Sequence, residues 1–237
     1  MPLPKLVTPE FTVVIPSTKE TIKIRPFLVK EEKVLYMALE GQDAKEIENA
    51  ILNVLEECIK TPGINIRKLP SYDVEYLFLQ LRGKSVGEKI SMRMTHQNSD
   101  ECKHATDVSF DVNEITVEFN EAHTNKVNIG GGFGIKFKDP SLSDLVNGTI
   151  NMNDEYEMVT SVISNCVETI YDENNVYDDF TIGEVKEFLN SMTQEQFNKM
   201  REFFDTLPRL RKEIAWTCSG CGKEDSVVVE GLQNFFT

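Results

Sequence analysis

The sequence predicts an α+β protein in which helices pack on small antiparallel β-hairpins. Two kinds of periodicity support this prediction. Some segments place apolar residues three or four positions apart, as helices do, and others alternate apolar and polar residues, as strands do. The order of helices, strand, polar turn and strand occurs in both halves of the 237-residue chain. We therefore expect one compact unit over residues 1–237. It could divide into halves at 1–122 and 123–237, joined through side-by-side hairpins near 90–112 and 212–230.

The chain is predicted to begin with a β-hairpin. Phe11 to Ile24 alternates apolar and polar residues around a turn at Pro16-Ser17-Thr18-Lys19. The next segment, Val29 to Leu39, has helical spacing and stops at Gly41. A hairpin followed by a helix is therefore the expected start of the fold.

Two further helices are predicted in the first half. One follows Asp43, which with Glu46 resembles a capping box. The other is capped by Ser71 and ends at Gly83. Their apolar faces consist of Ile47, Ala50, Ile51, Val54, Leu55, Cys58 and Ile59 in the first, and of Val74, Leu77, Phe78 and Leu81 in the second.

Strands are predicted in the middle of the chain, where the period changes to two. Residues 90–94 and 108–112 alternate on either side of a polar stretch, His96 to Lys103. Val117 and Phe119 could start another strand, and the glycines of residues 130–134 indicate a turn into a strand at 135–137.

The second half is predicted to repeat this order. One helical face extends over Tyr156, Val159, Ile163, Cys166, Val167 and Ile170. Thr181 with Glu184, and Thr193 with Gln196, form capping boxes before two further helices. A last hairpin places Ile214 and Trp216, then Val227 and Val229, on either side of a tight turn. The apolar residues Leu232, Phe235 and Phe236 are expected to pack on the body of the protein.

Composition and charge argue against several classes of protein. The 39 acidic and 25 basic residues give a net charge of −14, whereas nucleic-acid binders present a basic face to phosphate. No apolar run approaches the roughly 20 residues of a membrane helix, and residues 1–5 lack the pattern of a signal peptide. We expect a soluble, non-exported protein that binds neither nucleic acid nor membrane.

The strongest local signal is Cys218-Ser219-Gly220-Cys221-Gly222 between two predicted strands. Two thiolates two residues apart, with glycine opening the turn, form the knuckle of zinc ribbons, and structural zinc needs four ligands. The other polar turn contains His96, Cys102 and His104. We therefore predict a structural zinc site of Cys218, Cys221, Cys102 and His96, with His104 as the competitor of His96.

Two other interpretations of the knuckle remain open at this point. The cysteines could be free thiols of a turn that binds no metal, or a redox pair. A redox pair is disfavoured because such a motif normally starts a helix, which lowers the thiol pKa. Here Lys223-Glu224-Asp225 and a predicted strand follow.

The other candidate residues are assigned structural roles. Cys58 and Cys166 lie on apolar helix faces and are expected to be small buried hydrophobes. His123 has no nearby nucleophile in the sequence. The glycines of residues 130–134 lead into a strand and lack the ending of a phosphate loop, and residues 172–179 do not fit the calcium-loop frame. No pair of carboxylates can be singled out for catalysis.

Several stretches together resemble a known family. They are Met1-Pro2-Leu3-Pro4-Lys5, Ile24-Arg25-Pro26-Phe27-Leu28-Val29-Lys30-Glu31-Glu32-Lys33, Arg82-Gly83-Lys84-Ser85-Val86-Gly87-Glu88, His123-Thr124-Asn125-Lys126 and Val229-Glu230-Gly231-Leu232-Gln233-Asn234-Phe235-Phe236. The chain resembles the baseplate hub subunit and assembly protein family of T-even-type contractile-tailed bacteriophages. In such proteins the polar turns often look like two C-x-x-C pairs, whereas His96 and Cys102 stand at the first turn here.

The resemblance implies a non-enzymatic viral protein that acts in the host cytoplasm during tail assembly. It would be either a hub component in the virion baseplate or an assembly chaperone. Its expected partners are other baseplate hub or tape-measure tail proteins, and its oligomeric state stays open. The alternatives are a zinc-stabilised thiol or metal enzyme and a zinc-ribbon nucleic-acid binder.

Overall fold

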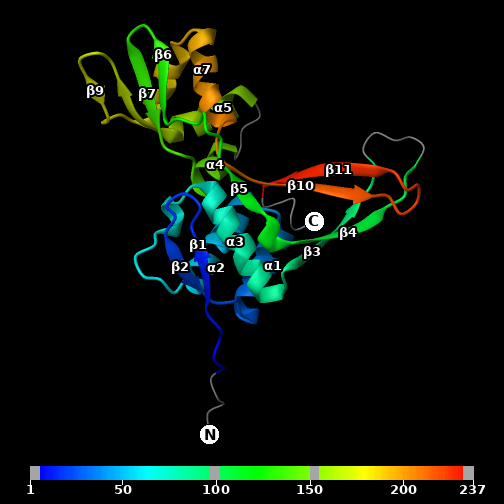
Figure 1. The fold of residues 1–237 in the computed structure, drawn as a ribbon. Helices are drawn as coiled ribbons and strands as arrows, with labels where there is room; N and C mark the ends of the chain where they lie inside the picture. Colours follow the sequence, from blue (N-terminus) through cyan, green and yellow to red (C-terminus); the bar gives the residue numbers. More distant parts are fainter. Residues whose placement is uncertain (1–5, 97–101, 150–154, 232–237) are drawn as a thin grey trace.

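The computed structural model describes residues 6–96, 102–149 and 155–231. Within these residues the chain forms seven α-helices and eleven strands in four small antiparallel sheets, so the predicted α+β class is confirmed. Figure 1 shows two parts, one above the other, and two hairpins that project from the lower part. None of the described helices combines the length and the apolar character needed to span a membrane.

The lower part contains the N-terminal elements and the C-terminal hairpin. Its first five elements are β1 (Phe11–Val14), β2 (Thr21–Ile24), α1 (Val29–Gly41), α2 (Ala44–Cys58) and α3 (Ser71–Val86). The chain continues with β3 (Lys89–Met94), β4 (Thr106–Asp111) and β5 (Thr116–Glu118), and it returns with β10 (Arg209–Thr217) and β11 (Glu224–Glu230). Strands β11, β10 and β5 form one sheet, and β3 pairs with β4 in another.

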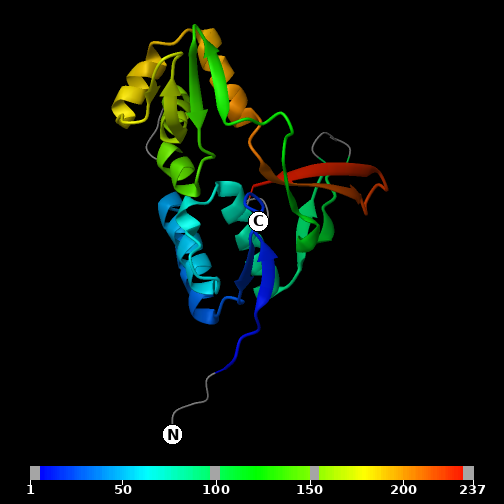
Figure 2. The same ribbon diagram turned by 60° about the vertical axis from the view of Figure 1, so that its left-hand side comes forward.

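The upper part is formed by the residues between β5 and β10. Its sheet has the order β6 (Lys126–Gly130), β7 (Phe133–Phe137), β8 (Val167–Tyr171) and β9 (Val176–Tyr177). Its helices are α4 (Leu142–Thr149), α5 (Glu155–Cys166), α6 (Ile182–Asn190) and α7 (Gln194–Asp205). Figure 2 shows helices on both sides of the strands.

Two apolar cores correspond to these two parts. The first core draws buried residues from Val13 to Ile115 and again from Leu210 to Val229. The second core lies entirely within Ile129 to Phe203. Apolar burial therefore joins the last hairpin to the N-terminal part of the chain. The single compact unit and its halves at 1–122 and 123–237 stay predictions.

The helix caps follow the sequence in most places. The Asp43 carboxylate accepts from the backbone amides of Lys45 and Glu46 at 2.9 Å, and the boxes begun by Thr181 and Thr193 are both formed. Helix α3 differs, because Pro70 holds the N-cap position that was predicted for Ser71. The helix also continues past Gly83 to Val86. Val112 packs closely against Gly83, because a Cβ there would lie only 3.3 Å from a Val112 methyl carbon.

The predicted helical face from Tyr156 to Ile170 is wrong beyond Cys166. Helix α5 ends there, and Val167 to Tyr171 form β8, which pairs with β7. Apolar residues continue at spacings of three and four across this boundary by coincidence. Val167 and Ile170 are β-branched, which favours a strand. The predicted packing of Leu232, Phe235 and Phe236 lies outside the described residues.

A buried ion pair holds α1 to the lower part. Arg25 and Glu31 are both buried, and Arg25 Nη2 donates to Glu31 Oε1 at 3.0 Å. The Glu31 carboxylate also accepts from the Leu28 amide, and Arg25 Nη1 lies 3.5 Å from Cys58 Sγ in α2. Burial raises the pKa of Glu31, but the hydrogen bonds from Arg25, Leu28 and Lys30 outweigh burial and lower the pKa overall.

Loss of this ion pair is expected to change the pH dependence of stability. Because the folded-state pKa of Glu31 lies below its unfolded value, the pair stabilises the fold above about pH 4.3. That stabilisation is lost as the pH falls through the lowered folded-state pKa. Glu31→Gln should cost about 3 kcal/mol at pH 7, since it leaves Arg25 buried without a counter-charge. Urea unfolding between pH 3 and pH 7 measures both effects. Glu32→Gln on the same helix is the control, and equal losses in the two variants would contradict the assignment.

A side chain at Gly134 is expected to displace the ring of Tyr171. It lies in β7, where a Cβ would overlap the ring of Tyr171 on the neighbouring strand β8. Gly134→Ala should therefore destabilise the protein by about 1–3 kcal/mol. Gly183→Ala is the matched control, because a Cβ there would meet only Thr181 Oγ1 at 3.8 Å. Thermal unfolding of both variants tests this expectation, and an unchanged midpoint for Gly134→Ala would refute it.

Candidate metal centre

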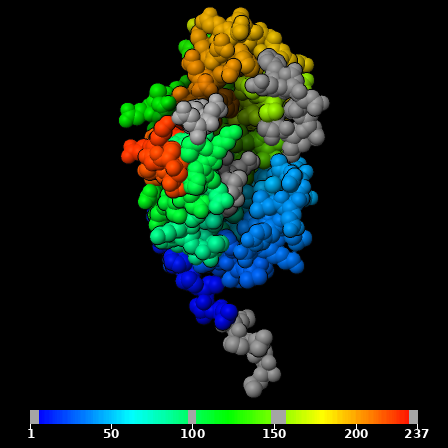
Figure 3. All heavy atoms as spheres, turned by 90° about the vertical axis from the view of Figure 1, so that its right-hand side faces the viewer, coloured from blue at the N-terminus to red at the C-terminus, as the bar shows by residue number. Residues whose placement is uncertain are grey.

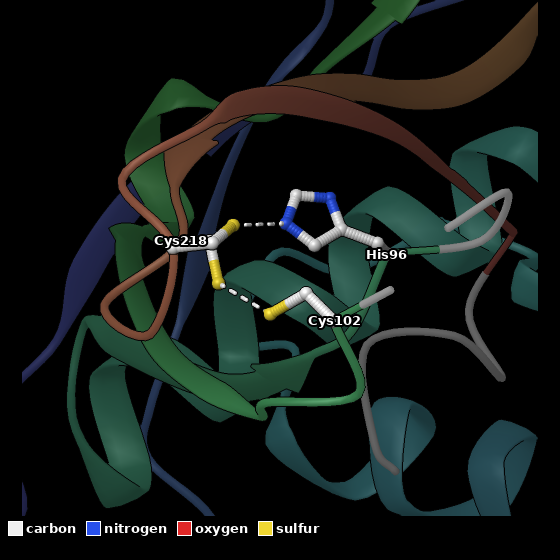
Figure 4. A group of neighbouring side chains, drawn as sticks. His96, Cys102 and Cys218 are labelled. Atoms are coloured by element: carbon white, nitrogen blue, oxygen red, sulfur yellow. Dashed lines mark hydrogen bonds between the residues drawn. The ribbon is translucent and has the colours of Figure 1, made fainter. Parts of the chain in front are cut away.

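Two polar turns that are distant in the sequence meet at the projecting hairpins. The segment between β3 and β4 supplies His96 and Cys102, and the turn between β10 and β11 supplies Cys218 and Cys221. Figure 4 shows the side chains of His96, Cys102 and Cys218 directed toward one another. The structure thus brings together all four residues that the sequence singled out as ligands.

The four donor atoms form a compact group. The one histidine nitrogen and the three sulfurs all lie within 4.8 Å of one another. Cys102 Sγ is 3.8 Å from Cys218 Sγ, and Cys221 Sγ is 3.4 Å from His96 Nε2. Cys218 is buried, Cys221 is exposed and the other two are half-buried. This group could hold a metal ion.

The cysteine turn depends on two glycines. The Cys218 amide donates to the Lys223 carbonyl at 2.9 Å, and the Gly222 amide donates to the Cys218 carbonyl at 2.8 Å. Gly222 has a φ of +73°, the left-handed conformation that glycine adopts without steric cost. A Cβ on Gly220 would lie 2.6 Å from the Cβ of His104. Glycine at this position therefore lets the two polar turns approach each other.

His104, the competitor of His96, has a different role. Its Nε2 lies 3.0 Å from Ser219 Oγ, which is 3.1 Å from Thr106 Oγ1. The Ser219 amide also donates to Thr106 Oγ1 at 3.0 Å. His104 and Thr106 therefore fasten the cysteine turn to the start of β4, while His96 supplies the nitrogen of the donor group.

Asp225 is a residue of the site that the sequence reasoning missed. Its Oδ2 lies 2.7 Å from His96 Nδ1, which leaves Nε2 directed at the sulfurs. The His96 ring also packs on Trp216, with ring centroids 5.0 Å apart. Asp225 pairs with Trp216 across β10 and β11, so the register of the hairpin places it beside His96. In the sequence, the position of Asp225 on the same face of the predicted strand as Val227 was the signal that could have indicated its role.

The electrostatics favour charged forms of both His96 and Cys218. The hydrogen bond to Asp225, followed by that to Cys218, raises the pKa of His96. Burial raises the pKa of Cys218, but the amides of Cys221 and Gly220 and the side chains of Cys221 and His96 lower it to about 6. The Lys223 amide lowers the pKa of Cys221, but burial and the neighbouring Cys218 and Cys102 sulfurs raise it overall. Cys218 therefore loses its proton at a lower pH than Cys221, as expected for a sulfur that accepts hydrogen bonds from backbone amides.

The remaining cysteines have the buried positions expected of them. Cys58 and Cys166 are both completely buried, in α2 and at the end of α5. Burial raises the pKa of Cys58 to about 11 and that of Cys166 to about 12. Both thiols therefore stay protonated at neutral pH, which disfavours metal binding or nucleophilic chemistry there.

His123 lies where the two parts of the molecule meet. Its Nδ1 is 3.0 Å from Thr206 Oγ1, and its Nε2 is 3.4 Å from Asp139 Oδ1. Asp139 also accepts from the Tyr72 hydroxyl of α3 at 2.8 Å. The His123 ring packs on Phe203 of the second core. These contacts agree with the structural role predicted for His123.

The two loops considered for phosphate and calcium are turns of the upper sheet. Gly131 and Gly132 have positive φ angles and connect β6 to β7. In the acidic loop, the Asp172 carboxylate accepts from the amides of Asn174 and Asn175 at 2.7 and 2.8 Å. Asp172 therefore shapes the turn before β9. The predictions of a plain turn and of a solvated loop agree with these contacts.

Comparisons with known proteins place the chain among phage tail proteins. A family model described as "T4 bacteriophage base plate protein" matches residues 8–237. The chain is also similar to the baseplate hub assembly protein gp26 of Enterobacteria phage T4. The two are 23% identical over 217 residues, which cover 91% of this chain and 92% of that protein. No solved structure matches the chain. The resemblance stated from the sequence is confirmed over nearly the whole chain.

Proposed function

The chain belongs to the T4 bacteriophage base plate protein family, and from that premise we propose that it acts without enzymatic activity in forming the baseplate hub. In this proposal it works through protein–protein contacts in the host cytoplasm. The observation that carries the proposal is the end-to-end similarity to a baseplate hub assembly protein, which covers 92% of that relative. A match of this extent relates whole chains and not one shared module.

The net charge is a further argument for protein partners over nucleic acid. The net charge of −14 opposes binding to phosphate backbones, because such binding requires the neutralisation of phosphates by basic residues. The partners we propose are other hub proteins or tape-measure tail proteins. The chain acts either as a lasting component of the virion baseplate or as a chaperone that is released.

We also propose that the candidate metal centre binds structural zinc through Cys218, Cys221, Cys102 and His96. A tetrahedral zinc ion with bonds of about 2.3 Å to sulfur and about 2.0 Å to nitrogen separates two sulfurs by about 3.8 Å and sulfur from nitrogen by about 3.5 Å. Two donor distances, 3.8 Å between the Cys102 and Cys218 sulfurs and 3.4 Å between Cys221 Sγ and His96 Nε2, support this proposal, and all four donors lie within 4.8 Å of one another. Four protein ligands leave no open position for a substrate, which favours a structural over a catalytic ion.

Zinc would stabilise the contact between two distant segments of the chain. It would join His96 and Cys102 to the cysteine turn at residues 218–221, so binding would close a loop of more than one hundred residues. Asp225 would hold His96 in the correct tautomer and orientation, as carboxylates behind zinc-bound histidines do.

Replacement of Asp225 is expected to weaken zinc binding without removing a ligand. Asp225→Asn should lower the affinity roughly 10- to 100-fold, because His96 loses its charged partner. Asp107→Asn is the matched control, since Asp107 is an exposed carboxylate of β4 that pairs with Arg93. Competition with a chromophoric chelator measures both affinities. Zinc bound at less than one ion per chain in the wild-type protein would contradict the site. Equal affinities of the two variants would contradict the role of Asp225.

The proposed role in the hub is tested by mass spectrometry of purified tails and of the infected-cell lysate. Co-expression of the chain with the hub and tape-measure proteins of the same virus should also yield a complex. A fixed stoichiometry in finished tails would identify a hub component. Abundance in the lysate with absence from tails would identify a released factor. The proposal fails if the chain co-purifies with none of these proteins.

A further inference from the structure

Helix α1 presents an unusually apolar outer surface. Of its 13 residues only Glu31 and Ala38 are buried. Its exposed large apolar residues are Val29 (80%), Val34 (46%), Tyr36 (61%), Met37 (62%) and Leu39 (50%). Single exposed apolar side chains are common on protein surfaces, but five large ones on a single 13-residue helix indicate an interaction surface. Figure 3 shows the blue N-terminal region as an outer wall of the lower part.

The apolar surface of α1 extends past its N-terminus. Leu28 and Val86 are also exposed, and the Phe27 amide donates to Ser85 Oγ at 3.0 Å. This bond holds the end of α3 beside the start of α1. The buried Arg25–Glu31 pair fixes the inner side of the helix, so the outward direction of its apolar side chains is set by the fold.

The charges on the outer side of α1 have a distinctive arrangement. Val29, Lys33, Tyr36 and Glu40 follow one another at helical spacing, opposite the buried Ala38. Lys33 and Glu40 are exposed, and neither forms an ion pair within the part of the chain that the structure describes. One positive and one negative charge therefore lie on either side of an apolar centre, and neither is paired with an opposite charge among the described residues.

We propose that α1 is a docking surface for α1 of a second copy of this chain. When two copies of this helix run antiparallel about a two-fold axis, Lys33 faces the partner's Glu40, and Glu40 faces the partner's Lys33. The midpoint between Lys33 and Glu40 falls between Tyr36 and Met37, so the same register brings these two apolar side chains together at the centre. Both ion pairs and the apolar contact are satisfied in one arrangement.

Self-complementarity is what selects a second copy over another partner. An interface with two-fold symmetry uses the same surface on both subunits, so a charge on one side of the axis meets a charge of the same patch from the other subunit. Lys33 and Glu40 meet that requirement across the axis. The opposed helix dipoles are also favourable in this arrangement.

The dimer is expected to be weak. A helix of 13 residues is about 20 Å long, and its outer face is smaller than the roughly 800 Å² per partner of a standard interface. Dimerisation in the micromolar range or above follows from this size. Dimers would therefore form only where the local concentration of the chain is high.

Charge reversal of the purified full-length chain tests the proposal. Sedimentation equilibrium over a wide micromolar range should show a monomer–dimer equilibrium. Lys33→Glu and Glu40→Lys should each raise the dimer dissociation constant roughly tenfold, since each turns two attractions into two repulsions. The double variant should restore dimerisation, because the two opposite charges face each other again. Tyr36→Glu should abolish it.

The control is Val176→Glu, which adds a charge at another exposed apolar residue, on β9 of the upper part. It should leave the equilibrium unchanged, and circular dichroism of each variant verifies that the fold is retained. A chain that stays monomeric throughout the concentration range would overturn the proposal. So would dimers that Tyr36→Glu leaves intact, or a double variant that fails to recover. The test uses this chain alone, so its outcome is independent of the proposed role in the hub.

Discussion

Strand β10 is the element on which both the first core and the candidate metal centre depend. It pairs with β11 on one side and with β5 on the other, and so ties the last hairpin to the middle of the chain. Its residues Leu210, Ile214 and Trp216 are buried in the first core, and so is Cys218, which directly follows the strand. Because Cys218 continues this alternation, the register that fills the core also directs its sulfur toward the opposite hairpin. A slip of one residue would expose the apolar side chains and turn the thiol away.

The sequence was most informative where one local rule determines the structure. Capping boxes begun by Thr181 and Thr193 located two helix starts, because both partners of each box lie within four residues. The cysteine turn was predicted because its two cysteines and its glycines lie within five consecutive residues. The sequence preferred His96 over His104, and His96 is the histidine that lies beside the three sulfurs. His104 is drawn to Ser219 and Gly220, and His96 follows the end of β3 into the donor group.

The features that the sequence could not predict depend on contacts between distant residues. Asp225 was missed because its significance arises only when β10 and β11 place it beside His96, 129 positions away. Gly83 was taken for a helix end because glycine often terminates helices, whereas here it admits Val112 from a later turn. Val167 and Ile170 continue a helical spacing by chance, and only pairing with β7 reveals a strand. In each case a tertiary contact overrides a local pattern.

Two polar clusters lie on different elements of the lower part of the molecule. The Arg25–Glu31 pair connects β2, α1 and α2 through Leu28 and Cys58, all within the first 58 residues. The cysteine–histidine group connects two hairpins and includes no residue of α1. Changes at one cluster should therefore reach the other only through the packed core between them. A base plate protein built in this way can expose an apolar helix for contacts while the stability of its hairpins is maintained separately. The outer surface of α1 is fixed by a short-range ion pair, whereas the hairpin turns are held together by residues far apart in the sequence, such as His96 and Asp225.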